Sequence, residues 1–187
     1  MLLLHVAANL ALHLALSLMF VYLLFSLDEY VTHRFLMHRM RLARWLKSKF
    51  LKRLCGNHMS LHHKRGYRHT DDSPDDSLAD ILIAAAIVGL PTAPIVWYVD
   101  PLTVYVAGVF AVVYSIVWWL VHLEMHRASG WFYAKNPLFR YLERRHQQHH
   151  EYPDTQYNIL LPFWDWVFRT HRVPEARLAR RQRAAAF

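Results

Sequence analysis

Hydrophobic residues are concentrated in three long runs along this 187-residue chain. Residues 2–27, 81–99 and 102–121 contain no Asp, Glu, Lys or Arg. A helix of about 20 residues crosses the hydrocarbon core of a bilayer, which is about 30 Å thick. The pattern therefore predicts an all-α integral membrane helical bundle with three to four spans. We expect residues 1–187 to form one domain.

The second and third runs are separated only by Asp100 and Pro101, which predicts a tight turn between two helices. Pro91 and Pro94 should kink the second run, because proline lacks an amide hydrogen and its ring crowds the preceding turn. The first run itself contains a polar stripe at helical spacing, formed by His5, Asn9, His13 and Ser17. Such residues hold neighbouring membrane helices together. DDSPDD, residues 71–76, predicts a turn that caps the second run.

Charge predicts how the spans are oriented. Residues 28–77 carry 11 Lys and Arg and residues 124–187 carry the other 11, whereas residues 1–27 carry none. Basic loops stay in the cytoplasm, so we expect the N-terminus outside and both basic segments on the cytoplasmic face. This topology accounts for the net charge of +8, and we expect no nucleic-acid partner. The single cysteine excludes an intrachain disulfide and a Cys-ligated cluster.

Histidine is the informative residue type in the two basic segments. The chain has 14 histidines, and 12 of them lie in these segments or directly beside them. Ten fall into four short motifs, HRFLMH, HMSLHH, HLEMH and HQQHH, which contain His33, His38, His58, His62, His63, His122, His126, His146, His149 and His150. Four such motifs on one side of a membrane favour metal binding over scattered surface histidines.

Spacing predicts how the rings are arranged. On a helix, residues three or four apart share a face, so we expect His122 to lie beside His126, His58 beside His62, and His146 beside His149 and His150. His33 and His38 are five apart and point about 140° away from each other on an ideal helix. Either a local distortion brings these two together or they bind different metals.

Ten imidazoles exceed what one metal ion can use. Imidazole binds iron, zinc, copper and nickel, and two ions would receive about five rings each. Glu29 and Glu124 lie close to the motifs in sequence, and either could orient a metal-bound histidine or serve as a helix cap. His69 and His171 stand alone and are more typical of solvent-facing or supporting positions.

The segments EYVTHRFLMH, HMSLHH, HLEMH and RRHQQHH resemble the fatty acid hydroxylase and sterol desaturase superfamily of membrane di-iron enzymes. The tail YLERRHQQHHEYPDTQYNILLPFWDWVFRT is similar to the end of fatty acid 2-hydroxylases. The resemblance covers about residues 25–172 and implies that the ten motif histidines bind two iron ions. HMSLHH departs from the family, which usually has two residues where this chain has three, so the match at His58 is the least direct.

The resemblance also implies an activity. Family members use O₂ to hydroxylate or desaturate an unactivated C–H bond, and this chain would take electrons from a separate cytochrome b5-like protein or a ferredoxin and its reductase. We expect hydroxylation of a lipid acyl chain drawn from the bilayer. Desaturation, or hydroxylation of a carotenoid or sterol ring, is the nearest alternative, since HRFLMH also resembles carotenoid hydroxylases. A non-catalytic zinc-binding membrane protein is the alternative of another class.

Aromatic and basic residues near the motifs receive weaker expectations. Trp97, Trp118 and Trp119 could line a substrate path, although aromatic residues at membrane interfaces are ordinarily anchors. Trp164 and Asp165 match the family's tail and should pack the last motif against the core. Arg144 and Arg145 could hold a lipid phosphate or a redox partner, but the predicted topology already accounts for both of these basic residues.

Overall fold

Three helical segments carry the membrane-spanning part of the protein. The computed structural model describes residues 1–64, 67, 77–175 and 177–178, and this part of the chain contains helices and no strand. The segments long and apolar enough to cross a membrane are Leu4–Met37, Leu78–Tyr98 and Pro101–Arg127. The predicted all-α membrane architecture is therefore confirmed. The predicted cap at residues 71–76 and His69 lie outside the described residues.

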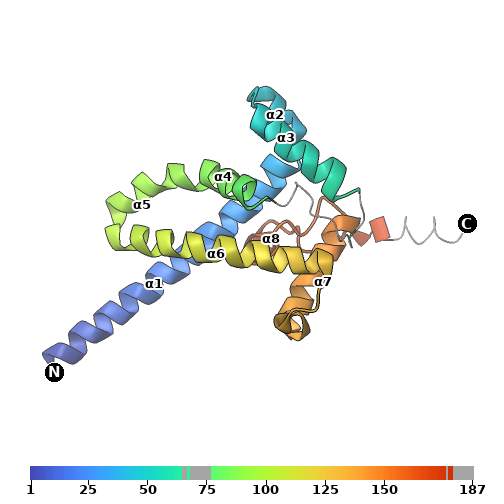
Figure 1. Ribbon diagram of the computed structural model, residues 1–187. Helices are drawn as coiled ribbons and strands as arrows, with labels where there is room; N and C mark the ends of the chain where they lie inside the picture. Colours follow the sequence, from blue (N-terminus) through green and yellow to red (C-terminus); the bar gives the residue numbers. More distant parts are fainter. Residues whose placement is uncertain (65–66, 68–76, 176, 179–187) are drawn as a thin grey trace, which may run out of the picture.

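The first and third spans extend beyond their apolar runs toward the histidine motifs. Helix α1 (Leu2–Val31) continues directly into a π-helical turn, η1 (Thr32–Met37). Helix α6 (Pro101–Arg127) likewise includes the whole HLEMH motif. Helices α4 (Leu78–Gly89) and α6 contact α1, and α5 (Ala93–Val99) packs against α6. Figure 1 shows the N-terminal part of α1 projecting past them. The spans thus present the histidines directly at their ends.

The second span is broken as its prolines predict. Helix α4 (Leu78–Gly89) gives way to a 3₁₀ turn, η4 (Leu90–Thr92), before α5 (Ala93–Val99) begins. The turn into α6 is held by Asp100, whose carboxylate accepts hydrogen bonds from the backbone amides of Leu102 and Thr103 at 3.2 Å each. Pairing an N-cap carboxylate with a proline at the first helical position is typical of helix starts.

Part of the polar stripe on α1 joins α1 to α6. His13 Nε2 lies 3.0 Å from Asp100 Oδ2, and the hydroxyls of Ser17 and Thr103 are 2.8 Å apart. These contacts confirm the predicted helix-joining role for His13 and Ser17. His5 is exposed.

Short helices outside the spans complete the chain. Figure 1 shows α2 and α3 projecting from one side of α1, and α7 lying beyond the end of α6. Ala43, Leu51 and Leu54 pack α2 and α3 against Leu36 and Met37 of η1. The bounds are α2 (Met40–Trp45), α3 (Lys49–Asn57), π-helical η2 (His58–His62), 3₁₀ η5 (Phe132–Lys135), α7 (Pro137–Glu151) and α8 (Phe163–Val167).

A buried ion pair joins α7 to the segment that follows it, residues 152–171, which is called the tail from here on. Arg145 Nη2 donates to Asp165 Oδ2 at 2.7 Å, and the two side chains are 8% and 0% exposed. Asp165 also accepts from the amides of Tyr157 and Asn158 and from the Thr170 hydroxyl. The structural role predicted for Asp165 is confirmed. Arg145 is not available to a lipid phosphate or a redox partner, because this pair buries it.

Trp164 anchors the same tail to the first span. Its indole N–H donates to the Leu23 carbonyl of α1 at 2.8 Å. The indole reaches this carbonyl from outside α1, and its ring packs beside that helix. The tail is therefore joined to α7 through Asp165 and to α1 through Trp164.

Replacing Asp165 tests this arrangement. The Asp165→Ala variant leaves the buried Arg145 guanidinium without its counter-charge, and we expect a loss of about 3–5 kcal/mol in stability. Asp154→Ala is the matched control, because Asp154 pairs with Arg177 at 2.6 Å where both are largely exposed, and such pairs contribute about 0–1 kcal/mol. Thermal unfolding in detergent measures both. Equal shifts for the two variants would contradict the assignment.

Candidate metal centre

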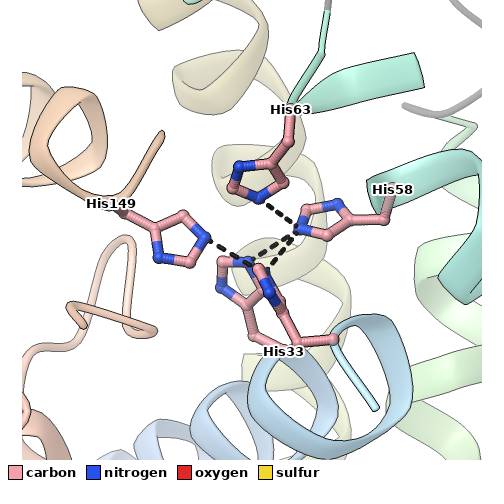
Figure 2. Close-up of side chains that lie close together, drawn as sticks. His33, His58, His63 and His149 are labelled. Carbon is pink, nitrogen blue, oxygen red and sulfur yellow. Dashed lines mark hydrogen bonds between the residues drawn. The ribbon is translucent and has the colours of Figure 1, made fainter. Parts of the chain in front are cut away.

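The ten motif histidines converge into two neighbouring groups at the ends of the spans. The first group comprises His33, His38, His58, His63 and His149, and the second contains His62, His126, His146 and His150. Within each group one ring nitrogen per residue lies within 4.8 Å of all the others. His122 adjoins the second group, with its Nε2 3.0 Å from that of His146. Five imidazoles therefore surround the first centre, and four surround the second with His122 beside them. Figure 2 shows four rings of the first group pointing toward one another.

Two π-helical turns explain the spacing of the first two motifs. A π-helix closes its hydrogen bonds over five residues, which brings residues five apart onto one face. His33 and His38 meet in this way beside η1. In η2 the amide of His63 donates to the carbonyl of His58 at 3.0 Å. Of the two possibilities for His33 and His38, the structure shows a local distortion that brings them together.

The π-turn divides HMSLHH between the two groups. His58 lies beside His62 as expected, but His58 joins the first group with His63, and His62 joins the second. The rings of His58 and His62 stack across the boundary, with centroids 4.8 Å apart. The extra residue in this motif is accommodated by the wider turn, which leaves His58 at the centre of the first group.

The fourth motif lies on a regular helix and supplies both groups. On α7, His146 and His150 are four residues apart and belong to the second group, with their Nε2 atoms 3.3 Å apart. His149 turns toward the first group, where its Nε2 is 3.2 Å from that of His38. His146 lies beside both His149 and His150 as expected, with ring centroids 5.9 and 4.7 Å away, but only His150 belongs to the same group.

Backbone carbonyls fix the orientation of three rings. The Nδ1 atoms of His33, His126 and His149 contact the carbonyl oxygens of Tyr157, Tyr67 and Thr155, at 2.5, 2.6 and 2.6 Å. A carbonyl only accepts, so Nδ1 carries the proton and Nε2 of the neutral ring presents its lone pair. Second contacts of this kind set the tautomer of metal-bound histidines. No sequence signal identifies these partners, because every residue has a carbonyl.

The two glutamates near the motifs do not contact histidines. Glu29 accepts hydrogen bonds from Trp118 Nε1 at 2.7 Å and from the tail amides of Ile159, Leu160 and Leu161. Glu124 accepts from the amides of Ser129, Gly130 and Trp131, which closes the turn after α6. Neither glutamate therefore orients a histidine by a direct hydrogen bond in the part of the chain that the structure describes, and the effect of Glu29 on the rings is indirect. The capping alternative describes Glu124, and Glu29 anchors the tail.

The nitrogen contacts are too many to be hydrogen bonds. His58 Nε2 lies 3.1, 3.0 and 3.2 Å from the Nε2 atoms of His33, His38 and His63. A ring nitrogen has one proton or one lone pair, so it forms one such bond and not three. His146 Nε2 has the same surplus, with three neighbouring Nε2 atoms at 2.9–3.3 Å. A cation between the lone pairs would satisfy all of them.

The separations fit a shared metal ion. Nitrogen ligands lie about 2.1 Å from zinc, and two such ligands are about 3.0 Å apart at a right angle and about 3.4 Å apart at a tetrahedral angle. The closest Nε2 contacts in both groups, 2.9–3.3 Å, fall in this range. Both groups could therefore hold metal ions, and imidazole alone does not select between iron and zinc.

Burial keeps these rings neutral. It lowers the pKa of His63 to about 3. Burial, followed by the proximity of other imidazoles, holds the pKa values of several more rings well below the usual value of about 6.5: His38, His58, His62, His146 and His149. A metal ion requires the neutral ring, so the site is prepared for binding without removing protons.

An apolar cavity between the spans reaches the first histidine group. His33 lines its inner part together with Met37, Leu54 and Trp118. A second cavity of about 350 Å³, bounded by α1, α4, α5 and α6, adjoins it. Phe25, Asp28, Ala85 and Ser115 line both cavities, so the two are neighbours that share this wall.

The remaining candidates differ in how they lie relative to the two groups. His171 stacks on Trp166 with ring centroids 4.0 Å apart. Of the three tryptophans considered for a substrate path, Trp118 lines the inner cavity and stacks on His122 at 4.6 Å, whereas Trp97 is half exposed. Neither Trp97 nor Trp119 lines either cavity.

A membrane helical bundle with two clusters of histidines is the class of protein that this fold and site define. The family model for fatty acid hydroxylase matches residues 18–170, and the chain belongs to that family. This match confirms the resemblance seen in the four motifs. No curated protein and no solved structure matches the chain.

Metal content tests the two groups separately. We expect about two metal ions per chain in wild-type protein purified in mild detergent, and about one after His58→Ala or His62→Ala, because each change removes a ligand from a different group. His171→Ala is the control and should retain two. Elemental mass spectrometry measures the content. Wild-type protein without metal, or His58→Ala with an unchanged content, would contradict the site.

Acidification should destabilise the metal-free protein. The histidine pKa is lower in the folded chain than in the unfolded chain, so between about pH 6.5 and about pH 3 the unfolded chain binds more protons. Stability is therefore fully present above about pH 6.5 and falls as the pH decreases through this window. Thermal unfolding of chelator-treated protein across this range measures the effect. A constant unfolding temperature would contradict the buried, neutral state of the rings.

Proposed function

We propose that this protein is a membrane di-iron monooxygenase that hydroxylates a lipid acyl chain with O₂ and externally supplied electrons. One observation carries the proposal: His33 belongs to the first histidine group and also lines an apolar cavity between the membrane-spanning helices. A substrate chain in that cavity would lie next to the metal centre. Membership of the fatty acid hydroxylase family supports the reaction class.

Iron is the metal that suits this chemistry. Two bound irons would supply the activation of O₂, so that one oxygen atom enters a C–H bond while the other is reduced to water with two electrons and two protons. Zinc fits the same nitrogen ligands, so zinc in a purified sample would report the site without supporting the reaction. The proposed reaction therefore requires a redox-active metal, which is a further requirement beyond metal binding.

The residues around the cavity would position the substrate and exclude water. Leu54, Met37 and Trp118 give the inner cavity an apolar wall beside His33. Trp118 is itself fixed, because its indole N–H donates to Glu29 and its ring stacks on His122. An apolar chain is favoured in such a cavity by the hydrophobic effect. A dry wall also protects the reaction from water.

Electrons would come from a separate protein. A cytochrome b5-like domain or a ferredoxin with its reductase is the expected donor, and it would reach the site from the cytoplasmic face. The charge asymmetry of the sequence supports this orientation, with the N-terminus outside and the histidine motifs and C-terminus in the cytoplasm.

Lipid analysis tests the reaction. Cells expressing the wild-type gene with a suitable electron donor should accumulate a lipid that is heavier by one oxygen atom, and isotopically labelled O₂ should place the label in that product. His149→Ala should abolish the product, because His149 supplies the first histidine group. His171→Ala is the matched control and should retain it. Mass spectrometry of extracted lipids measures the outcome.

Other products would select an alternative. A loss of two hydrogens would identify desaturation, and a hydroxylated carotenoid or sterol would identify ring hydroxylation. Metal binding without oxygen consumption, in the presence of reductant and lipid, would instead indicate a non-catalytic zinc protein. Any of these three results would overturn acyl-chain hydroxylation.

A further inference from the structure

A polar side chain lies in the wall shared by the two apolar cavities. Asp28 lines both the inner and the outer cavity, and only 9% of its surface is exposed. Thr32 donates to its Oδ1 at 3.1 Å. Among the described residues no donor contacts the other carboxyl oxygen, Oδ2. An ionisable side chain inside a membrane bundle is costly, and such residues commonly mark substrate pathways.

The carboxyl oxygen is aimed at the junction of the two cavities. A Cβ placed on Gly89 of α4 would lie 3.3 Å from Asp28 Oδ2, so Oδ2 sits against the α4 backbone where that helix forms the outer wall. A larger residue at position 89 would crowd this oxygen. The close approach therefore keeps the carboxyl group at the wall that the two cavities share.

Tyr114 adds a second polar group beside Asp28. Its hydroxyl is buried and interacts with the buried carboxylate of Glu29, and the residue lines the inner cavity. The ring is held between Phe25 and Phe110, with centroids 5.7 and 5.8 Å away. Because a phenol both donates and accepts hydrogen bonds, it remains able to bind a ligand hydroxyl in the cavity.

We infer that this junction binds an internal hydroxyl group of the lipid substrate. A hydroxyl both donates and accepts, so it would complement a carboxyl oxygen and a phenol together. A free carboxylate would be repelled by the adjacent acidic side chains of Asp28 and Glu29. Apolar walls on both sides of the junction require hydrocarbon on both sides of the hydroxyl. The substrate class is therefore a neutral lipid with a mid-chain hydroxyl, which deepens the proposed function and rests on it.

Binding of matched lipids tests the inference without catalysis. Methyl octadecanoate is compared with a positional series of methyl monohydroxyoctadecanoates, each added to purified protein in the same detergent. Dissociation constants come from ligand-dependent thermal stabilisation. We expect at least one hydroxylated ester to bind about tenfold more tightly than the unsubstituted ester, as two added hydrogen bonds allow.

Two conservative variants assign the preference to the junction. Asp28→Asn and Tyr114→Phe should each reduce the preference for the hydroxylated ester over methyl octadecanoate by severalfold, while an unfolding temperature close to that of the wild type without ligand reports intact folding. Tyr105→Phe is the matched control, because this tyrosine lies on the same helix, is 64% exposed and lines neither cavity. It should keep the full preference.

The outcomes separate this inference from the proposed reaction. Equal affinity of wild-type protein for the whole series would overturn the hydroxyl site, as would a preference that both junction variants retain. A preference that depends on the junction, in a protein that converts none of the esters, would support the site and count against the monooxygenase proposal.

Discussion

The metal centre depends on the hydrogen bonds that the buried carboxylate of Glu29 accepts. This side chain, at the end of α1, binds Trp118 of α6, Asn158 and three consecutive backbone amides of residues 159–161. The tail is thereby held against the spans, and its carbonyls at Thr155 and Tyr157 meet the Nδ1 atoms of His149 and His33. Glu29 thus helps to orient the rings of His33 and His149 by holding the tail, although its carboxylate contacts neither ring.

The two π-helical turns determine how the histidines are divided. In a regular helix, rings five residues apart diverge, and neither His33 with His38 nor His58 with His63 would share a centre. The wider turn brings each pair together, and it also leaves His62 facing the second group. π-helical turns are rare and occur frequently at functional sites. Here they allow two short segments to supply five of the ten rings.

The metal centre is shielded from water and adjoins the space between the membrane-spanning helices. Its rings are buried and neutral, which favours metal binding, while the inner cavity extends from His33 toward the space between the spans. Soluble ferritin-like di-metal bundles use carboxylates for much of their coordination. In this chain the nearby carboxylates of Glu29, Glu124 and Asp165 instead hold the backbone in place, and imidazole supplies the converging nitrogens.

The sequence by itself determined the three spans, the broken second span and the ten histidines that converge, because hydropathy, proline and short-range spacing act locally. It did not determine which histidine joins which group, since helical spacing predicts which rings are neighbours but not how neighbouring rings are divided between two centres. Nor could it find the carbonyl partners, which are the same in every residue, or the contact between Glu29 and Ile159, which are 130 positions apart. Only the tertiary structure decided these features, because they depend on where the tail returns to the spans.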